Sequence, residues 1–223
     1  MRLKAIKHFI SELLYERRYG VRTSGKLILD KHDAENVCYA PMNWRQFRST
    51  LRHDTVTDRD VFLDIGSGKG RAVLMAAIGY PFARVIGVEL IKEFHDIAER
   101  NLLAVSRRCR AAKVELICAD LRDYQIPDDV TVVYMNNPVR GAIFKHVLSS
   151  MTDSMKRRPR RMRWIYFNPL EEEAILVTGE WRKVCTIAPG WRKPKSPYGT
   201  TCVYESRQTG LSSMPVSQAD WKA

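Results

Sequence analysis

The chain has 223 residues, of which 45% are hydrophobic and 28% are charged. These proportions are typical of a soluble globular protein and exclude disordered and fibrous classes, and the length suits one domain with a sizeable core. No apolar run approaches the roughly 20 residues that cross a membrane, so we expect no membrane span. Lys and Arg number 37 against 25 Asp and Glu, and the formal charge of +12 favours anionic partners such as nucleic acid or acidic proteins.

Residues 1–60 are predicted to form an N-terminal helical segment that caps the domain or binds substrate. Apolar residues at helical spacing predict a helix over residues 3–19, and Gly20 follows where a helix cap belongs. A basic amphipathic helix can bind a membrane surface or a partner, but we favour packing of its apolar stripe on its own domain. A second helix is predicted near Trp44–Arg52. The apolar stripe consists of Leu3, Ile6, Ile10, Leu13 and Leu14.

Residues 61–208 are predicted to form an α/β domain, because short apolar runs alternate there with helical stretches. The clearest helical stretch runs from Ile91 to about Arg108. The alternation indicates right-handed crossovers, and runs that are apolar throughout indicate strands covered on both faces. We therefore expect a doubly wound, mostly parallel, Rossmann-like sheet. Its parallel strands are expected at Val61–Ile65, Arg84–Val88, Lys113–Cys118, Val130–Met135 and Arg163–Phe167.

The last third of the chain departs from this alternation. Trp181–Ile187 and Thr200–Glu205 are predicted to be strands joined by a turn rich in glycine and proline. Such a hairpin would complete a seven-stranded sheet and place an antiparallel strand at one edge. Residues 209–223 are predicted to be a C-terminal tail.

The positive charge is densest from Lys156 to Arg163, where six of eight residues are cations. We favour a solvated loop over a nucleic-acid patch for this segment, because no aromatic residue that could stack on a base is interleaved with the cations. Both interpretations stay open from the sequence.

Cysteine and histidine spacing bears on location and on metals. The five cysteines are widely spaced without a Cys-x-x-Cys pair, which favours a reducing cytoplasmic location over a disulfide framework. The five histidines lack the spacing of metal ligands. No metal site is therefore expected.

The most informative stretch is a glycine-rich turn that directly follows the first predicted strand and opens a helix. Glycines let the backbone turn sharply and approach a ligand, and the helix N-terminus offers unpaired N–H groups. Gly70 comes one residue earlier than the Gly-x-Gly-x-x-Gly pattern of dinucleotide-binding folds requires. Asp64 places a carboxylate beside the turn, which would repel a pyrophosphate and attract a ligand that carries ammonium and sulfonium groups. The turn comprises Gly66, Ser67, Gly68, Lys69 and Gly70.

Two further acids end the next two strands. Glu89 ends the second strand, 23 residues after Gly66, where a carboxylate can accept hydrogen bonds from both hydroxyls of a ribose. Asp120 ends the third strand, where the amino group of a base could be bound. Because ligands bind at the carboxyl ends of the strands in open α/β sheets, the three acids are expected along the ligand-binding edge. A lone acid at a strand end is usually a cap or a solvated residue, and for Asp120 this alternative stays open.

These features resemble the class I S-adenosylmethionine-dependent methyltransferases. The resemblance covers about residues 60–206 and rests on Asp-x-Gly-x-Gly-x-Gly at 64–70 together with Glu89 and Asp120. The spelling Leu-Asp-Ile-Gly-Ser-Gly-Lys-Gly-Arg is similar to the branch that contains the non-SET histone lysine methyltransferases and many small bacterial methyltransferases. The resemblance implies S-adenosyl-L-methionine as cofactor, S-adenosyl-L-homocysteine as product, and an antiparallel last strand.

The resemblance also implies roles for individual residues. Asp64 and the glycine turn would hold the methionine moiety, Glu89 would bind the ribose, and Asp120 with Leu121 would frame the adenine. The cofactor-binding residues that it implies are Asp64, Gly66, Ser67, Gly68, Gly70, Glu89, Leu90, Asp120, Leu121 and Asn136.

The methyl acceptor would meet the tip of the fourth strand, Tyr134-Met-Asn-Asn-Pro-Val139. In the resembling family this tip faces the transferred methyl group, and the asparagine side chain and nearby carbonyl groups accept hydrogen bonds from the target amine. Asn137 and Pro138 are therefore expected to be catalytic residues. Val139 stands where a flipped base would need a stacking aromatic residue, which lowers the nucleobase interpretation. An ordinary Asn-Pro turn remains the alternative, and Asn168-Pro169 is a second such turn.

The leading hypothesis is an N-directed methyltransferase that acts on an amine of a protein, such as a lysine, or of a small molecule. The positive charge keeps a nucleic-acid methyltransferase as a second hypothesis. A non-catalytic, methyltransferase-like protein that binds the cofactor or scaffolds a partner is the third. A dinucleotide oxidoreductase is disfavoured by the glycine spacing and by Asp64. The sequence has no signature of oligomeric state.

Overall fold

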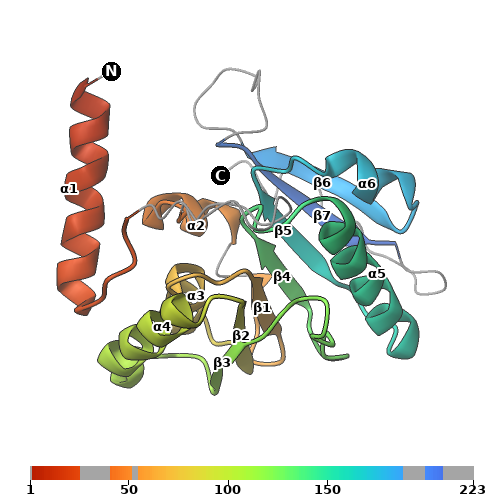
Figure 1. Cartoon of the computed structure of the whole chain (residues 1–223), viewed down its shortest axis with the longest axis horizontal. Coiled ribbons are helices and arrows are strands. Elements are labelled where there is room, and N and C mark those ends of the chain that lie inside the picture. Colours follow the sequence, from red (N-terminus) through yellow and green to blue (C-terminus); the bar gives the residue numbers. More distant parts are fainter. Residues whose placement is uncertain (1, 26–40, 52–54, 188–198, 208–223) are drawn as a thin grey trace.

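The computed structural model describes residues 2–25, 41–51, 55–187 and 199–207 (Figure 1). Within these ranges, seven strands form one sheet in the order β3-β2-β1-β4-β5-β7-β6. The first five strands pair in parallel, which confirms the doubly wound, mostly parallel α/β fold. The strands are β1 (Val61–Ile65), β2 (Arg84–Glu89), β3 (Val114–Cys118), β4 (Val132–Met135), β5 (Arg163–Phe167), β6 (Trp181–Ile187) and β7 (Thr201–Ser206).

The hairpin of β6 and β7 is present, and β7 is the antiparallel last strand that the sequence predicts. The hairpin lies at one edge of the sheet as expected, because β6 is the edge strand and pairs antiparallel with β7, which lies between β5 and β6. Nearly all of β7 is buried, whereas β6 exposes Arg182 and Lys183. Charged side chains suit an edge strand, so the more apolar strand of the hairpin takes the inner place. The connecting residues 188–198 and the predicted tail 209–223 lie outside the described residues.

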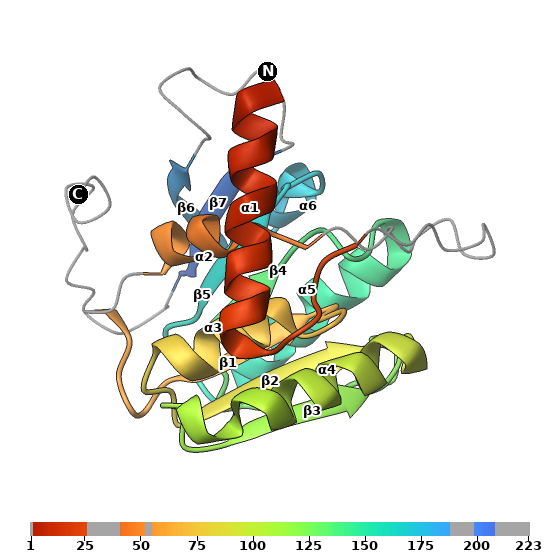
Figure 2. The same cartoon turned by 90° about the vertical axis from the view of Figure 1, so that its left-hand side faces the viewer.

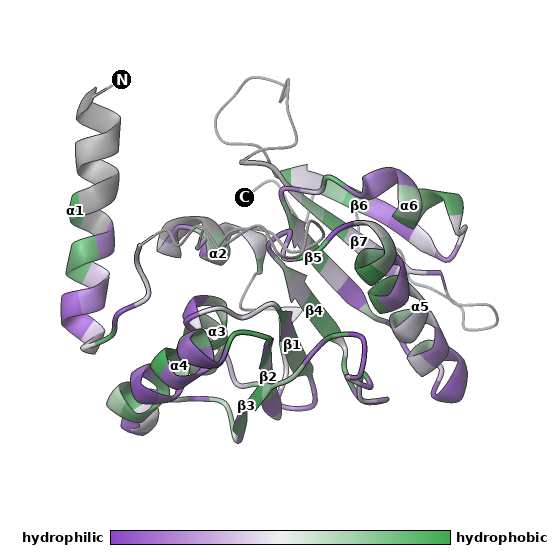
Figure 3. Ribbon diagram, viewed as in Figure 1, coloured by the Kyte–Doolittle hydropathy of each residue, from purple (hydrophilic) through white to green (hydrophobic). Residues whose placement is uncertain are grey.

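Helices cover both faces of the sheet (Figures 1 and 2). One core lies between the sheet and α2 and α3, and a second lies between the sheet and α5. Hydrophobic residues line the central strands, while hydrophilic residues lie on the outer helices (Figure 3). No helix among the described residues is long and apolar enough to cross a membrane. The helical elements are α1 (Arg2–Tyr19), α2 (Trp44–Thr50), α3 (Arg71–Gly79), α4 (Lys92–Val105), the short 3-10 helix η2 (Ser106–Arg108), α5 (Gly141–Arg157) and α6 (Glu172–Val177).

Helix α1 forms as predicted and ends at Gly20, which adopts a positive φ of 69°. The predicted packing of its apolar stripe is wrong at the three stripe residues whose exposure the structure describes. Ile10, Leu13 and Leu14 are 48%, 39% and 60% exposed, and the N-terminal end of the helix projects away from the sheet (Figures 1 and 2). Glu12 is buried instead, because the helix turns its acidic side toward a buried arginine of α3.

The basic segment from Lys156 to Arg163 is held by specific contacts. The guanidinium of Arg157 donates to Asp128 at 2.8 Å and 3.0 Å, and that of Arg161 donates to Glu205 at 2.5 Å. Arg160 is half-buried and donates to the carbonyl oxygens of Val130 at 2.6 Å and of Ser154 at 3.0 Å. Much of the cationic character of this segment is therefore used to fasten the end of α5 to the neighbouring loop and strand.

Replacing Arg160 tests this structural role. Arg160→Ala leaves backbone carbonyl groups without their charged donor and should lower the free energy of unfolding by about 2–4 kcal/mol in urea denaturation. Arg158 is exposed and makes no side-chain hydrogen bond within the described residues, so Arg158→Ala should change the free energy by less than about 0.5 kcal/mol. Equal losses in the two variants would contradict the assignment.

Candidate functional site

The glycine turn that follows β1 is shaped by three positive φ angles, 72° at Gly66, 55° at Gly68 and 83° at Gly70. The N–H groups of Gly66 and Ser67 donate to the carbonyl oxygen of Val88 at 3.0 Å and 2.9 Å, which fixes the turn against the end of β2. Residues that carry a side chain rarely adopt such positive φ angles, so the backbone of the turn requires glycine at these positions. The turn leads directly into α3, whose N-terminus offers unpaired N–H groups.

The turn also contacts the tip of β4. A Cβ atom added to Gly66 would lie 2.3 Å from the Cβ atom of Pro138, closer than any real contact. The absent side chain of the first glycine therefore lets the turn after β1 pack on the Asn-Pro turn after β4. The predicted cofactor turn and the predicted acceptor turn are thus in direct contact.

Asp64 and Glu89 lie at the ends of the neighbouring strands β1 and β2. Both are buried, with 2% and 7% of their surface exposed. Glu89 accepts hydrogen bonds from the N–H groups of Gly68 at 2.6 Å and Ile91 at 2.9 Å, whereas Asp64 accepts none from the described residues. Neither carboxylate forms an ion pair with a described cation.

Burial sets the electrostatics of this pair. Burial raises the pKa of Asp64 well above its usual value, and the neighbouring charge of Glu89 raises it further. Burial also raises the pKa of Glu89, although the N–H groups of Ile91 and Gly68 partly oppose the increase. Two like-charged carboxylates without a cation of their own are a site where a positively charged ligand would be stabilised.

Asp120 is arranged differently from the other two acids. Its carboxylate accepts hydrogen bonds from the backbone N–H of Arg122 at 2.8 Å and from the guanidinium of Arg122 at 2.6 Å and 3.0 Å. The side chain of Arg122 lowers the pKa of Asp120. The loop after β3 thus provides local hydrogen bonds to this carboxylate, and the alternative of a loop residue without a ligand role stays open.

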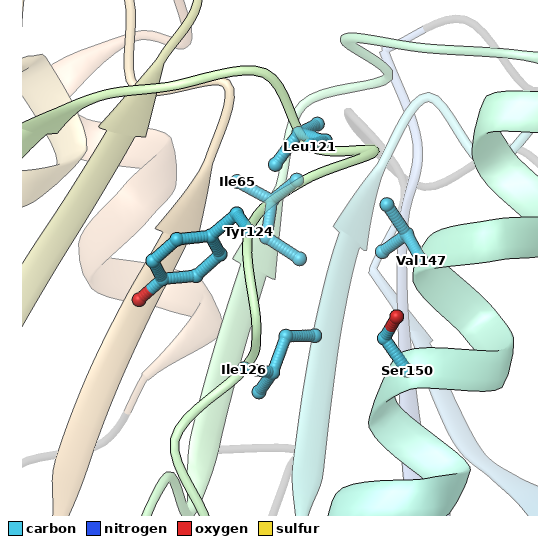
Figure 4. A pocket seen from close by; sticks show the side chains of 6 residues that line it. All are labelled: Ile65, Leu121, Tyr124, Ile126, Val147 and Ser150. Atoms are coloured by element: carbon cyan, nitrogen blue, oxygen red, sulfur yellow. The ribbon is translucent and has the colours of Figure 1, made fainter.

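Leu121, next to Asp120, lines a small pocket with apolar walls (Figure 4). The connection between β3 and β4 contains no helix in residues 119–131, and its side chains cover the sheet directly. The Tyr124 hydroxyl points away from the other labelled side chains (Figure 4). The pocket lies between the end of β1, this connection and α5. The lining residues are Ile65, Leu121, Tyr124, Ile126, Val147 and Ser150.

The Asn-Pro turn after β4 is held by hydrogen bonds from side chains at the end of β5. Asn137 is buried, has a φ of 47°, and accepts a hydrogen bond from the Tyr166 hydroxyl at 3.1 Å. Burial raises the pKa of Tyr166, so the hydroxyl remains a donor. Asn136 accepts a hydrogen bond from the side-chain amide of Asn168 at 3.2 Å. Asn168 has a φ of 54°, so the two Asn-Pro turns adopt the same unusual backbone conformation side by side.

Asn168 is one residue that sequence reasoning missed, although the repeated Asn-Pro at the ends of two neighbouring strands was a usable signal. Arg71 and Asn101 were missed as well. Asn101 of α4 accepts a hydrogen bond from the N–H of Arg22 at 2.8 Å and donates to the carbonyl oxygen of Lys69 at 3.0 Å. It therefore ties the segment that follows α1 to the glycine turn, which no local sequence pattern indicates.

A group of possible metal ligands occurs on α4 within the described residues. His95, Asp96 and Glu99 place one ligand atom each within 4.8 Å of one another. Asp96 accepts a hydrogen bond from Lys92 at 2.5 Å, and the His95 Nε2 atom lies 3.5 Å from Glu99. Contacts between residues one helical turn apart account for this grouping.

Comparison with known proteins connects this geometry to a family. A sequence profile described as "Histone methylation protein DOT1" matches residues 19–174. A curated protein from Drosophila melanogaster, "Histone-lysine N-methyltransferase, H3 lysine-79 specific", is 26% identical over 140 residues, which cover 59% of this chain. The match covers 8% of that protein, so the chain spans less than a tenth of its relative's length.

Solved structures share the fold. An RNA methyltransferase from Salinibacter ruber, crystallised with S-adenosyl-L-homocysteine, matches with a TM-score of 0.51 and 20% identity over 80% of this chain and 99% of that chain. The mitomycin 7-O-methyltransferase MmcR matches with a TM-score of 0.54 and 16% identity over 74% of this chain and 53% of that chain. The Bacillus subtilis tRNA methyltransferase TrmK matches with a TM-score of 0.51 and 12% identity over 74% and 65% of the two chains.

Replacing Asp64 tests the electrostatics of the carboxylate pair. Because its pKa is raised above the ordinary value of 3.8 in the folded state, Asp64 reduces stability progressively as the pH rises from that value through its folded pKa. Asp64→Asn removes this loss, so the ligand-free variant should be more stable than the wild type, by on the order of 1–2 kcal/mol near neutral pH and by less near pH ~4.

Urea denaturation across this pH range measures the effect. Asp120→Asn is the matched control, because the pKa of Asp120 is lowered and its loss should destabilise the protein instead. An Asp64→Asn variant that is less stable than the wild type at every pH would contradict the assigned electrostatics.

Proposed function

The chain belongs to the DOT1 histone methylation family, and on that premise we propose that it transfers a methyl group from S-adenosyl-L-methionine to an amine nitrogen of a protein, such as a lysine side chain. The observation that carries the proposal is the buried pair Asp64 and Glu89, which flanks the glycine turn without an ion pair to any described cation. A cofactor with sulfonium and ammonium groups supplies the missing positive charge. The Drosophila relative is named as a methyltransferase specific for lysine 79 of histone H3, which supports a protein lysine as the methyl acceptor here.

The residues present fit this cofactor. Glu89 has a buried carboxylate at a strand tip, where it would accept hydrogen bonds from the ribose hydroxyls. The glycine turn and the N-terminus of α3 would receive the methionine moiety, with Ser67 in the turn and Leu90 beside Glu89. Leu121 and the apolar pocket would adjoin the adenine, and Asp120 would bind its amino group after exchanging its contact with Arg122.

The Asn-Pro turn after β4 would bind the acceptor amine. The side-chain oxygens of Asn136 and Asn137 already accept hydrogen bonds from Asn168 and Tyr166. We therefore propose that these side chains hold the shape of the turn, and that its backbone carbonyl groups accept the hydrogen bond from the amine. Pro138, packed against Gly66, would keep this turn next to the cofactor.

When bound, the cofactor supplies a sulfonium methyl group that is open to in-line displacement by an amine lone pair. The chain's contribution is alignment, which is worth up to roughly 7–11 kcal/mol in well-positioned systems. A lysine has an ordinary pKa near 10.4, and burial against the turn would lower it and favour the neutral, reactive amine.

The organisation and location of the chain form part of the proposal. Residues 61–208 would be the methyltransferase domain, with a helical segment before it and a tail after it. The described cysteines Cys109, Cys118, Cys185 and Cys202 are free, which supports a cytoplasmic location. Nucleic-acid methylation has less support, because arginines of the basic segment are bonded to Asp128, Glu205 and backbone carbonyl groups.

Transfer of radiolabelled methyl groups to a cell extract tests the acceptor class. We expect label in the protein fraction with the wild type and none with the Glu89→Ala variant. Label found only in the nucleic-acid fraction or only in small molecules would overturn the proposed acceptor, and absence of label in all fractions would favour a non-catalytic role.

Cofactor binding itself is tested by Glu89. Losing a charged hydrogen-bond partner costs about 1.5–3 kcal/mol, so Glu89→Ala should weaken S-adenosyl-L-methionine binding by roughly 10- to 150-fold in calorimetry. Glu93 lies four residues away on the exposed side of α4, so Glu93→Ala is the matched control and should bind as the wild type does. Unchanged affinity in the Glu89 variant would contradict the proposed site.

A further inference from the structure

We infer that Glu12 and Glu16 of α1 are counter-ions of Arg71 that keep the cofactor site net negative. The N-terminal helix would thereby contribute to cofactor binding. The inference rests on the proposed function, because the charge that the site must accommodate is that of S-adenosyl-L-methionine. It gives α1 an electrostatic task, and it explains why the helix turns its acidic side inward and leaves leucines exposed.

Arg71 joins the glycine turn to the N-terminal segment. It is the first residue of α3, directly after Gly70, and it is only 5% exposed. Its guanidinium lies over the Trp44 ring, 5.4 Å from the centroid. The guanidinium donates hydrogen bonds to two acids of α1, Glu12 and Glu16, the latter at 3.5 Å. It also donates to the carbonyl oxygen of Met42 at 2.9 Å, to Thr23 Oγ1 at 2.8 Å and to Ser24 Oγ at 3.0 Å.

The charge of Arg71 acts on the same interior as Asp64. Asp64 of β1 and Tyr134 of β4 are opposite each other in neighbouring strands, and Asp64, Tyr134 and Arg71 are all buried. Burial raises the pKa of the Tyr134 hydroxyl, the charge of Asp64 raises it further, and the charge of Arg71 lowers it. An uncompensated guanidinium at this place would oppose the carboxylates that are to attract the cofactor cation.

Glu12 and Glu16 supply the compensation. Glu12 is buried and forms an ion pair with Arg71. Although burial disfavours the charged form of Glu16, hydrogen bonds from Thr23 and Ser24 lower its pKa, so it stays ionised. Two carboxylates of α1 therefore face one guanidinium, and they balance the positive charge of Arg71.

A merely structural role makes a different prediction. If the ion pair only fastened α1 to the glycine turn, its loss would weaken every ligand of the site alike. A counter-ion role affects S-adenosyl-L-methionine more than S-adenosyl-L-homocysteine, because the two ligands share all groups except the methyl group and the positive charge on sulfur. The ratio of the two dissociation constants therefore separates the two roles.

Calorimetric titration of the full chain with both ligands tests the inference. Glu12→Gln should weaken S-adenosyl-L-methionine binding by on the order of tenfold and S-adenosyl-L-homocysteine binding by less than about threefold. Arg71→Gln should shift the ratio the opposite way, because it leaves the acids without their cation. This second variant keeps the test valid if Glu12→Gln does not fold.

Asn101→Ala is the matched control. It loosens the same attachment of the N-terminal segment to Lys69 without changing any charge, so both ligands should weaken by the same factor. An unchanged ratio of the two dissociation constants in both charge variants would overturn the inference. A wild type that binds neither ligand would instead overturn the proposed function.

Discussion

The structure is organised around two carboxylates that are costly to bury. Asp64 and Glu89 lie at adjacent strand tips, both almost fully buried, and the described residues offer them no ion pair. Folding tolerates this because the pKa of each group rises with burial and because Glu89 accepts two backbone hydrogen bonds. A cationic ligand would be stabilised by these unpaired carboxylates, because its binding would supply the positive charge that the folded chain does not.

The segments around Asp64 and Glu89 are held in place by contacts with one another. The glycine turn packs so closely on Pro138 that the proposed cofactor turn and the proposed acceptor turn are in direct contact. The neighbouring Asn-Pro turns brace each other through Asn136 and Asn168. Arg71, the buried cation that directly follows the turn, faces acids of α1, so its charge is balanced by the N-terminal segment and not by Asp64. The proposed site for a positive ligand would thus contain a buried arginine and keep its negative charge.

Local patterns in the sequence were sufficient for the sheet and for the acids at the tips of its strands. Continuous apolar runs predict strands wherever both faces are covered, and the glycine turn is encoded in consecutive residues. Contacts between distant segments were not predictable in this way. The apolar periodicity of α1 indicates which side is hydrophobic, but the demand of buried Arg71 for a counter-ion decided which side faces inward. Similarly, the basic segment near Arg160 is dense in charge, yet its contacts are with carbonyl groups brought close only by folding.

Proton release on ligand binding, measured by calorimetry in buffers of different ionisation enthalpy, tests the electrostatic origin of this site most directly. At about pH 6 the amino groups of both S-adenosyl-L-methionine and S-adenosyl-L-homocysteine are protonated, so protons that leave on binding come from the protein. We expect S-adenosyl-L-methionine to displace more protons than S-adenosyl-L-homocysteine, because its sulfonium lowers the raised pKa values of Asp64 and Glu89. Equal release by the two ligands, or uptake of protons with S-adenosyl-L-methionine, would contradict the role assigned to the buried carboxylates.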